Sequence, residues 1–333
     1  MCIRDSLWFW LMTSIALVIG LGAGNFFKPG IGAKLESTVV LDAPKPVTKT
    51  IIDQVVPESI FQALSENALI QIVFFSILFG LALASIGEKN KPVVHFLKSV
   101  TETMFKVTEY IMQFAPIGVG AAMAAAIGAH GIEIMFRLAK LVGTLYFALI
   151  IFIVLNLIAV KVIAKIKLRR TLYELKDALV LAFSTTSSES ALPKAIQSME
   201  KLGVPEHIVN FVLPAGYSFN LSGTTLYLAL ASLFIAQGAG VQMTLSQQIV
   251  MMLTLMITSK GVAAVPRASL VVLASTCAQF NLPIEWIAVI LGVDEIMDMA
   301  RTTVNVLGNC LSSVIVAKWE GVLPCLLYTS RCV

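Results

Sequence analysis

The chain has 333 residues, of which 57% are hydrophobic and only 13% are charged, with a mean hydropathy of +0.86. Because soluble domains carry about a quarter charged residues, this composition excludes an ordinary soluble protein and predicts a polytopic membrane protein. The net charge of +4 is too small to indicate nucleic-acid binding, so we expect no nucleic-acid partner.

Both ends of the chain have the character of sequencing adaptors. One short oligonucleotide, read in its two orientations, can encode residues 1–6 and 325–330, and its continuation encodes residues 331–333. We therefore interpret residues 1–6 and 325–333 as adaptor scars and exclude them from the fold prediction. Between these ends only Cys277 and Cys310 remain, both in apolar segments, so neither a disulfide framework nor a metal-binding spacing is expected.

The hydrophobic runs of the chain predict transmembrane α-helices. Runs long enough to cross a hydrocarbon core of about 30 Å cover residues 7–27, 67–87, 93–127 and 142–160. The run 93–127 is predicted as one segment that begins amphipathic and ends in small residues, which suit close helix packing. These runs predict an all-α fold.

Basic residues follow two of these runs, in loops 88–92 and 161–170. Two predicted spans lie between the loops, so both loops can face the same side of the membrane. The positive-inside rule makes that side cytoplasmic. The connections 28–58 and 128–133 are then predicted to be external.

Polar residues interrupt the long apolar second half of the chain three times. The interruptions at 184–190, 216–225 and 259–269 place hydroxyls, amides and helix breakers at membrane depth. Unwound backbone exposed to lipid would cost several kcal/mol for each unpaired group, so these segments are predicted to line an enclosed site. A solvated loop is the alternative for the serine-rich run. Broken or re-entrant segments at matching positions in two halves indicate a transporter site near the midplane.

The last apolar run carries a polar stripe, formed by Asp294, Asp298, Arg301, Thr302, Asn305 and Asn309. On a helix, all of these except Thr302 lie on one face, within an arc of roughly 80°. A charge at the bilayer centre costs roughly 2.5–3.5 kcal/mol, so the stripe predicts a charged small molecule or ion as its partner. A structural ion pair between Asp298 and Arg301 is the alternative, but it leaves the other members unexplained.

Four ordered motifs now identify a resemblance: Ser-Ser-Glu-Ser at 187–190, Gly-Tyr-Ser-Phe-Asn-Leu-Ser-Gly-Thr at 216–224, Ser-Lys-Gly-Val-Ala-Ala-Val-Pro at 259–266 and Asp-Met-Ala-Arg-Thr-Thr-Val-Asn-Val at 298–306. From about residue 7 to 321, the chain closely resembles the dicarboxylate/amino acid:cation symporter family. This family contains bacterial glutamate/aspartate transporters and relatives of the excitatory amino acid transporters. A member of this family is among the examples behind the general inverted-repeat rule, so that rule is not independent support.

The resemblance implies a glutamate-transporter-like fold with inverted repeats, broken helices, eight transmembrane helices and two re-entrant hairpins, of which this chain would begin at the third helix. Residues 7–27 would be that third helix, in a mobile transport unit. Residues 28–127 would supply an external loop and the fourth and fifth helices. These two helices and the missing first two helices would form the scaffold that holds a homotrimer together. Residues 128–321 would supply the sixth helix, first hairpin, seventh helix, second hairpin and eighth helix, which complete the transport unit.

The resemblance also implies a substrate site, made of Ser187, Ser188, Thr224, Val265, Asp298, Arg301, Thr302 and Asn305. Asp298 would bind the substrate ammonium, and Arg301 would bind the side-chain carboxylate, because its planar fork pairs with a carboxylate bidentately. Asp294 would support these two residues from behind. The charges suit glutamate or aspartate better than a C4-dicarboxylate such as succinate, fumarate or malate, which would bring Asp298 no cation. A C4-dicarboxylate symporter is the alternative.

The implied cation-coupling residues are Thr13, Ser14, Gly216, Ser218, Asn220, Ser222 and Asn309. Sodium-coupled relatives have Asp where this chain has Ser222 and Asn309, and usually Met where it has Leu221. Because two carboxylates that would balance the charge of sodium are replaced, we expect proton coupling. Sodium coupling is the alternative, and no metal other than sodium is expected. The proton carrier is left open among Asp294, Asp298 and Glu189.

Lys260 and Arg267 in the second hairpin have two interpretations. They could attract an anionic substrate, or they could snorkel to the membrane surface, and we expect the second. The three histidines, His95, His130 and His207, lack metal-ligand spacing, so structural roles are expected.

Two other functional classes fit less well. An intramembrane hydrolase would use Ser259 with Lys260, but adjacent helical residues point about 100° apart and no Ser–His–Asp set is evident. A passive anion channel would need a continuous polar face, whereas the polar groups concentrate at broken segments. We therefore expect a non-enzymatic, multi-pass symporter of a bacterial inner membrane that works as an elevator. It would bind an acidic amino acid, contact lipid and need no cofactor.

Overall fold

The computed structural model describes residues 2–32, 56, 59–65, 69–262 and 267–323, and all regular secondary structure in these ranges is helical. This confirms the predicted all-α fold class. The predicted gate residue Val265 and the predicted adaptor scar at 325–333 lie outside the described residues. Four described segments, 4–27, 71–104, 133–164 and 206–238, are long and apolar enough to cross a membrane, which supports a multi-pass protein.

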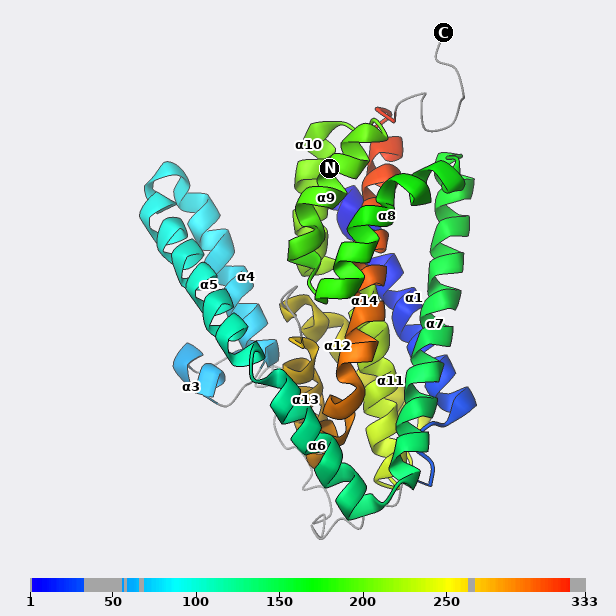
Figure 1. Cartoon of the computed structure of the whole chain (residues 1–333). Helices are drawn as coiled ribbons and strands as arrows, with labels where there is room; N and C mark the ends of the chain where they lie inside the picture. The colour runs from blue at the N-terminus through cyan, green and yellow to red at the C-terminus, as the bar shows by residue number, and fades with distance from the viewer. Residues whose placement is uncertain (1, 33–55, 57–58, 66–68, 263–266, 324–333) are drawn as a thin grey trace. The chain divides into compact units, whose positions relative to one another are not determined.

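The chain divides into two compact units, residues 36–131 and residues 1–35 with 132–333. The first of these contains α3 (Ile60–Ser65), α4 (Leu69–Ile86), the 3₁₀ turn η1 (Gly87–Asn90), α5 (Lys91–Met112) and α6 (Ala115–His130). Helices α4 and α5 run in opposite directions from η1 (Figure 1). Large apolar side chains such as Phe79 and Leu81 of α4 are exposed.

The prediction of a single segment over 93–127 is wrong, because the structure divides it into α5 and α6. Helix α5 ends at Met112, and Pro116 occupies the first turn of α6. Proline has no N–H and fits the start of a helix better than its interior, so it favours a new helix at this point.

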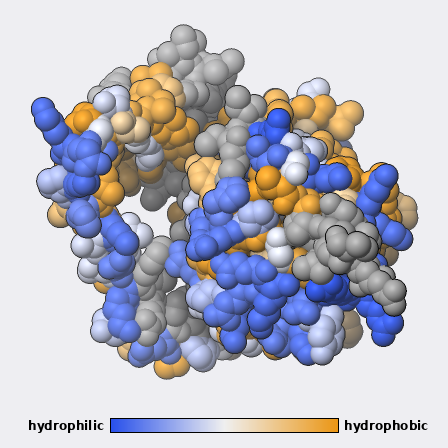
Figure 2. All heavy atoms as spheres, turned by 90° about the horizontal axis from the view of Figure 1, so that it is seen from above, coloured by the Kyte–Doolittle hydropathy of each residue, from blue (hydrophilic) through white to orange (hydrophobic). Residues whose placement is uncertain are grey.

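The second unit is built around three long helices, α1 (Cys2–Phe27), α7 (Glu133–Ala164) and α14 (Glu285–Trp319), as Figure 1 shows. Helix α7 extends beyond the predicted run 142–160 at both ends, and its 32 residues span about 48 Å. The basic residues in its last turn and just after it are exposed at one end of this unit: Lys161, Lys165, Lys167, Arg169 and Arg170. Figure 2, seen from above Figure 1, shows many hydrophilic side chains at that end.

Two helical hairpins belong to this unit, as predicted. The first consists of α8 (Leu168–Thr185) and α9 (Ser188–Lys201), which are separated by only two residues. The second contains α12 (Leu245–Thr258), the 3₁₀ turn η2 (Ser259–Gly261) and α13 (Ser269–Gln279). The hairpins enter from opposite ends and both approach α14 near its middle (Figure 1).

An interrupted helix completes the unit. Helix α10 (Glu206–Phe219) stops and α11 (Ser222–Gly238) begins after two non-helical residues, Asn220 and Leu221. Every residue of α11 from Ser222 to Ala236 is buried, so α11 forms the centre of this unit. Helix α1 packs closely on it, because a Cβ atom at Gly20 would lie 2.6 Å from the carbonyl oxygen of Leu226.

Candidate functional site

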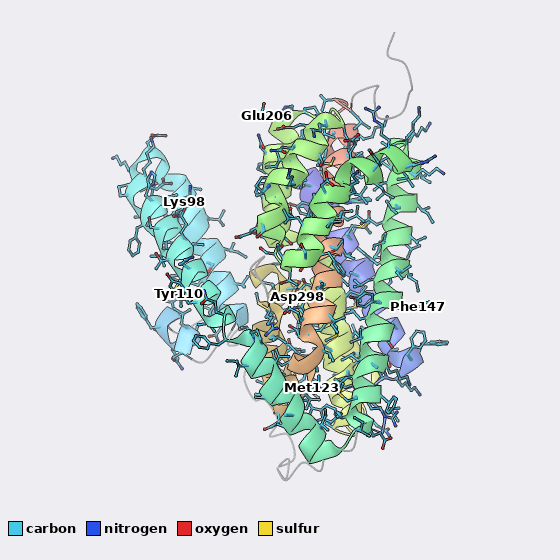
Figure 3. All side chains as sticks on the ribbon, viewed as in Figure 1. Lys98, Tyr110, Met123, Phe147, Glu206 and Asp298 are labelled. Carbon is cyan, nitrogen blue, oxygen red and sulfur yellow. The ribbon has the colours of Figure 1, made fainter. Side chains whose placement is uncertain are left out.

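A small cavity lies where the two hairpins, the break between α10 and α11, and the middle of α14 meet; Figure 3 labels Asp298 there. Its lining residues are Thr186, Ser188, Leu221, Thr224, Val262, Ala268, Ser269, Asp298, Arg301, Thr302 and Asn305. The cavity measures about 10 Å³, enough for one water-sized group. An amino acid can therefore enter only when some of the lining groups move apart.

Arg301 is the central charge of the site, and only 1% of its surface is exposed. Its Nε donates to Asp298 Oδ1 at 2.7 Å, and its Nη1 donates to Asp294 Oδ1 at 3.2 Å. The guanidinium carbon lies 4.2 Å from the ring centroid of Tyr227, in cation–π geometry. Burial of a guanidinium is tolerable only with such partners. Two carboxylates and one guanidinium leave this group with one net negative charge.

Asp298 connects α14 with the second hairpin. Besides Arg301, its Oδ1 accepts a hydrogen bond from Thr302 Oγ1 at 3.0 Å, and its Oδ2 accepts one from the backbone N–H of Arg267 at 2.9 Å. Arg267 is the first described residue after the gap at 263–266 and lies just before α13 of the second hairpin. Its Nη2 pairs with Glu295 at 2.7 Å. Asp298 therefore ties the second hairpin to α14.

The first hairpin contributes backbone more than hydroxyl groups. Ser187 caps α9, because its Oγ accepts from the backbone N–H of Ser190 at 3.3 Å. Ser188, the first residue of α9, lines the cavity, so the positive end of a helix lies there. The carbonyl oxygen of Thr186 lies 3.4 Å from Thr302 Oγ1 and is the more distant of two acceptors for that hydroxyl. Ser187 was predicted to bind substrate, but its hydroxyl is engaged as a cap and does not line the cavity.

Asn305 joins α14 to the start of α11. Its Oδ1 accepts from the backbone N–H of Gly223 at 2.8 Å, and its Nδ2 donates to Thr224 Oγ1 at 2.9 Å. Of the predicted substrate residues, the cavity lining thus includes Ser188, Thr224, Asp298, Arg301, Thr302 and Asn305. Asp294 lies behind Arg301 and is fully buried.

Part of the predicted cation-coupling set forms a neutral amide network. Asn220 Nδ2 donates to Asn309 Oδ1 at 2.9 Å, and Ser222 Oγ donates to Asn220 Oδ1 at 2.9 Å. A Cβ atom at Gly216 would lie 2.4 Å from Asn309 Oδ1, so a larger residue here would displace the Asn309 amide from this position. Ser218 is exposed, because two residues turn a helix by about 200° away from Gly216. The structure therefore does not bring its hydroxyl into the network.

The predicted residues of α1 lie beside the second hairpin. Thr13 Oγ1 accepts from Lys260 Nζ at 2.8 Å, whereas Ser14 Oγ donates to the carbonyl of Trp10 at 2.8 Å. The expectation that Lys260 and Arg267 snorkel outward is wrong for this structure. Lys260 turns inward to Thr13 and Arg267 bonds to α14 through Asp298 and Glu295, because each finds oxygen acceptors within the bundle.

Other kinds of site find little support in the geometry. The Ser259 hydroxyl is buried without a hydrogen-bond partner among the described residues, and the Lys260 ammonium points to other groups. The two residues therefore do not form a nucleophile–base pair. In the described part of the chain, no three His, Cys, Asp or Glu residues gather closely enough to hold a metal ion.

Sequence reasoning missed several members of the site. Tyr227, which underlies Arg301, is three residues beyond Thr224 and so lies on the same helical face; that spacing is a signal that could have found it. The cavity-lining residues Thr186, Ala268 and Ser269 flank the recognised motifs, whereas Leu221 and Val262 lie within two of them. The Asp298–Arg301 pair of the structural alternative is present, but Asp294 and Tyr227 share the same guanidinium.

Comparison with known proteins gives a consistent result. The model of the sodium:dicarboxylate symporter family matches residues 1–319. The "Proton/sodium-glutamate symport protein" of Geobacillus stearothermophilus is 46% identical, over 96% of this chain and 78% of the relative. The "Proton/glutamate-aspartate symporter" of Bacillus subtilis is 43% identical, over 96% and 79%. The "C4-dicarboxylate transport protein" of Rhizobium johnstonii is 38% identical, over 96% and 74%.

Proposed function

Because the chain belongs to the sodium:dicarboxylate symporter family, we propose that it imports glutamate or aspartate together with protons. Membership of this family makes it a transporter and not an enzyme. The observation that carries the choice of substrate is the buried Arg301, held between Asp294 and Asp298 inside the cavity. This set offers one cationic and two anionic groups to an entering molecule.

An acidic amino acid complements Asp298 and Arg301. Its ammonium would bind Asp298, which accepts several donors already. Its side-chain carboxylate would take the place of Asp298 at the guanidinium fork of Arg301, where a bidentate pair can form. Its α-carboxylate would face Ser188 and the N-terminus of α9, whose free N–H groups favour an anion.

Charge balance supports symport. The three charged residues carry one net negative charge, and an acidic amino acid adds another. Two uncompensated negative charges in a closed, low-dielectric site are strongly unfavourable, so cations must accompany the substrate. A C4-dicarboxylate would add two negative charges and no ammonium, which makes it the less favoured substrate. It remains the second candidate because a C4-dicarboxylate transport protein is among the relatives.

The amide network does not favour a sodium ion. Sodium needs several hard oxygen ligands and counter-charge, whereas Asn220 directs an N–H group at Asn309 and no carboxylate stands at Ser222 or Asn309. A proton can instead neutralise Asp294 or Asp298 directly. Glu189 is a weaker candidate for the proton carrier, because it is exposed. The names of the relatives include both protons and sodium, so the preference for protons rests on the residues of this chain.

For the whole protein we propose a homotrimer in a bacterial inner membrane. The exposed apolar side chains of α4 and α5 suit contact with lipid or with partner subunits, and the named relatives are bacterial. The unit with the hairpins would carry substrate as an elevator, and the unit of residues 36–131 would be the scaffold.

The test is ion replacement in proteoliposomes that contain the purified protein. With an inward proton gradient and choline in place of sodium, labelled glutamate should accumulate against its gradient, and excess unlabelled aspartate should compete. Succinate should compete at least about tenfold less well, since it lacks the ammonium that pairs with Asp298. Strict dependence on sodium would overturn the ion assignment, and uptake of succinate but not glutamate would overturn the substrate assignment.

A further inference from the structure

Lys260 has unusual surroundings for a lysine in a membrane protein. It lies on η2, directly after α12 of the second hairpin. Its Nζ donates to Thr13 Oγ1 of α1 at 2.8 Å and to the carbonyl oxygen of Phe219, the last residue of α10, at 2.6 Å. The ring centroid of Trp10 lies 5.5 Å from the same nitrogen. The ammonium therefore joins three elements that meet beside the helix break.

All of these partners are neutral. Among the described residues, no carboxylate lies within ion-pair distance of Lys260. A fully buried hydroxyl, a carbonyl at the negative end of a broken helix and an aromatic face attract any small monovalent cation. Unwound carbonyls and half-helix C-termini are the groups with which transporters hold coupling cations.

We propose that Lys260 determines ion specificity. Its ammonium is a tethered cation that occupies the position of a coupling sodium ion. This position lies between α1, the end of α10 and the second hairpin. This inference rests on the proposed symport. A sodium ion at the same oxygens would meet the ammonium charge at close range, so it is excluded by repulsion and by loss of its ligands. At this position, the Lys260 ammonium supplies the positive charge that a bound sodium ion would supply in a sodium-coupled transporter.

A purely structural latch is the competing interpretation. In that case the hydrogen bonds of Lys260 only join the second hairpin to α1 and α10, and losing them weakens the protein whatever salt is present. The two interpretations differ in the response to sodium after the ammonium is removed. Only the tethered cation leaves behind oxygens that a free cation can use.

The experiment compares wild type with Lys260→Met, which keeps an unbranched side chain one atom shorter and removes the ammonium group. Lys201→Met, at an exposed site on α9, is the matched control. Thermal stability of the purified proteins is measured in sodium chloride and in choline chloride at equal ionic strength. Wild type and the control should respond equally to both salts. Lys260→Met should melt lower in choline chloride and recover, saturably, with sodium.

Thr13→Val in the Lys260→Met background identifies the site, because it removes one of the two oxygens. The sodium response of the double variant should be at least about tenfold weaker in apparent affinity, as expected for a lost bond to a charged group. In proteoliposomes, glutamate uptake by Lys260→Met should become sodium-dependent while wild type stays indifferent.

A folded Lys260→Met protein whose stability and uptake ignore sodium would overturn the inference, as would a sodium response that Thr13→Val leaves unchanged. The inference would also be overturned if sodium stabilised wild type and Thr13→Val abolished that effect. This comparison does not require a Lys260 variant to fold. The melting measurements require no substrate. Failure of wild type to take up glutamate would therefore refute the proposed function separately.

Discussion

Helices α14 and α4 show two opposite ways of placing polar and apolar residues in a membrane protein. Helix α14 buries Asp294, Asp298 and Arg301, whereas α4 has no charged residue and exposes large apolar side chains such as Phe79. In water the charged helix would be outside and the apolar helix inside. Lipid removes the advantage of burying apolar groups, so a buried charge in this protein marks a group that must be shielded from hydrocarbon.

The comparison teaches that polarity inside such a bundle signals function. Around Arg301, two carboxylates, an aromatic ring and the break between α10 and α11 are gathered. A structural need alone would be met by one ion pair. The exposed side chains of α4 carry no comparable constraint beyond remaining apolar. Substitutions in the two regions should therefore differ in kind as well as in size.

The largest effect is expected from Arg301→Ala. Removing one partner of a buried ion pair costs about 3–5 kcal/mol, and the substrate carboxylate loses its cation as well. Glutamate uptake should fall by roughly 10²–10³-fold, while binding of a neutral amino acid can persist. Uptake and tritiated substrate binding in proteoliposomes measure both. Arg301→Lys, which keeps the charge but not the fork, is the control and should be intermediate; full glutamate transport by Arg301→Ala would refute its role.

A charge placed on α4 tests the other side of the comparison. Leu78 is 51% exposed, so Leu78→Asp should cost roughly 2.5–3.5 kcal/mol in membrane insertion if this face meets hydrocarbon. The yield of membrane-inserted protein should drop, whereas Leu78→Ala should insert normally. Equal yields of the two variants would show that the exposed face of α4 is solvated by water, and the contrast with α14 would disappear.

A smaller effect is expected from Gly216→Ala, since the added methyl group would meet the Asn309 amide at 2.4 Å. Overpacking of this kind typically costs about 1–3 kcal/mol. The melting temperature of the purified protein should fall, and Asn309→Ser should restore part of it by shortening the opposing side chain. Gly22→Ala is the matched control, because nothing lies within 4 Å of its added Cβ. Equal stability of both alanine variants would contradict the close packing.

Much of the fold was predictable because the bilayer imposes simple rules on the chain. Length and hydropathy indicated the spans near residues 7–27, 67–87 and 142–160, and polar interruptions indicated the two hairpins and the break at Asn220. Local stereochemistry was harder to foresee. The division of 93–127 depends on Pro116, whose preference for a first turn starts a new helix within a pattern that changes from amphipathic to apolar.

The sequence by itself determined which face of α14 is polar, because a period of 3.6 residues places Asp294, Asp298, Arg301 and Asn305 together. It could not determine which groups oppose that face. Only the tertiary structure decided that Tyr227 underlies the guanidinium and that Lys260 turns inward to Thr13. These contacts join residues far apart in the chain, and their geometry follows from how the helices pack, which no local pattern encodes.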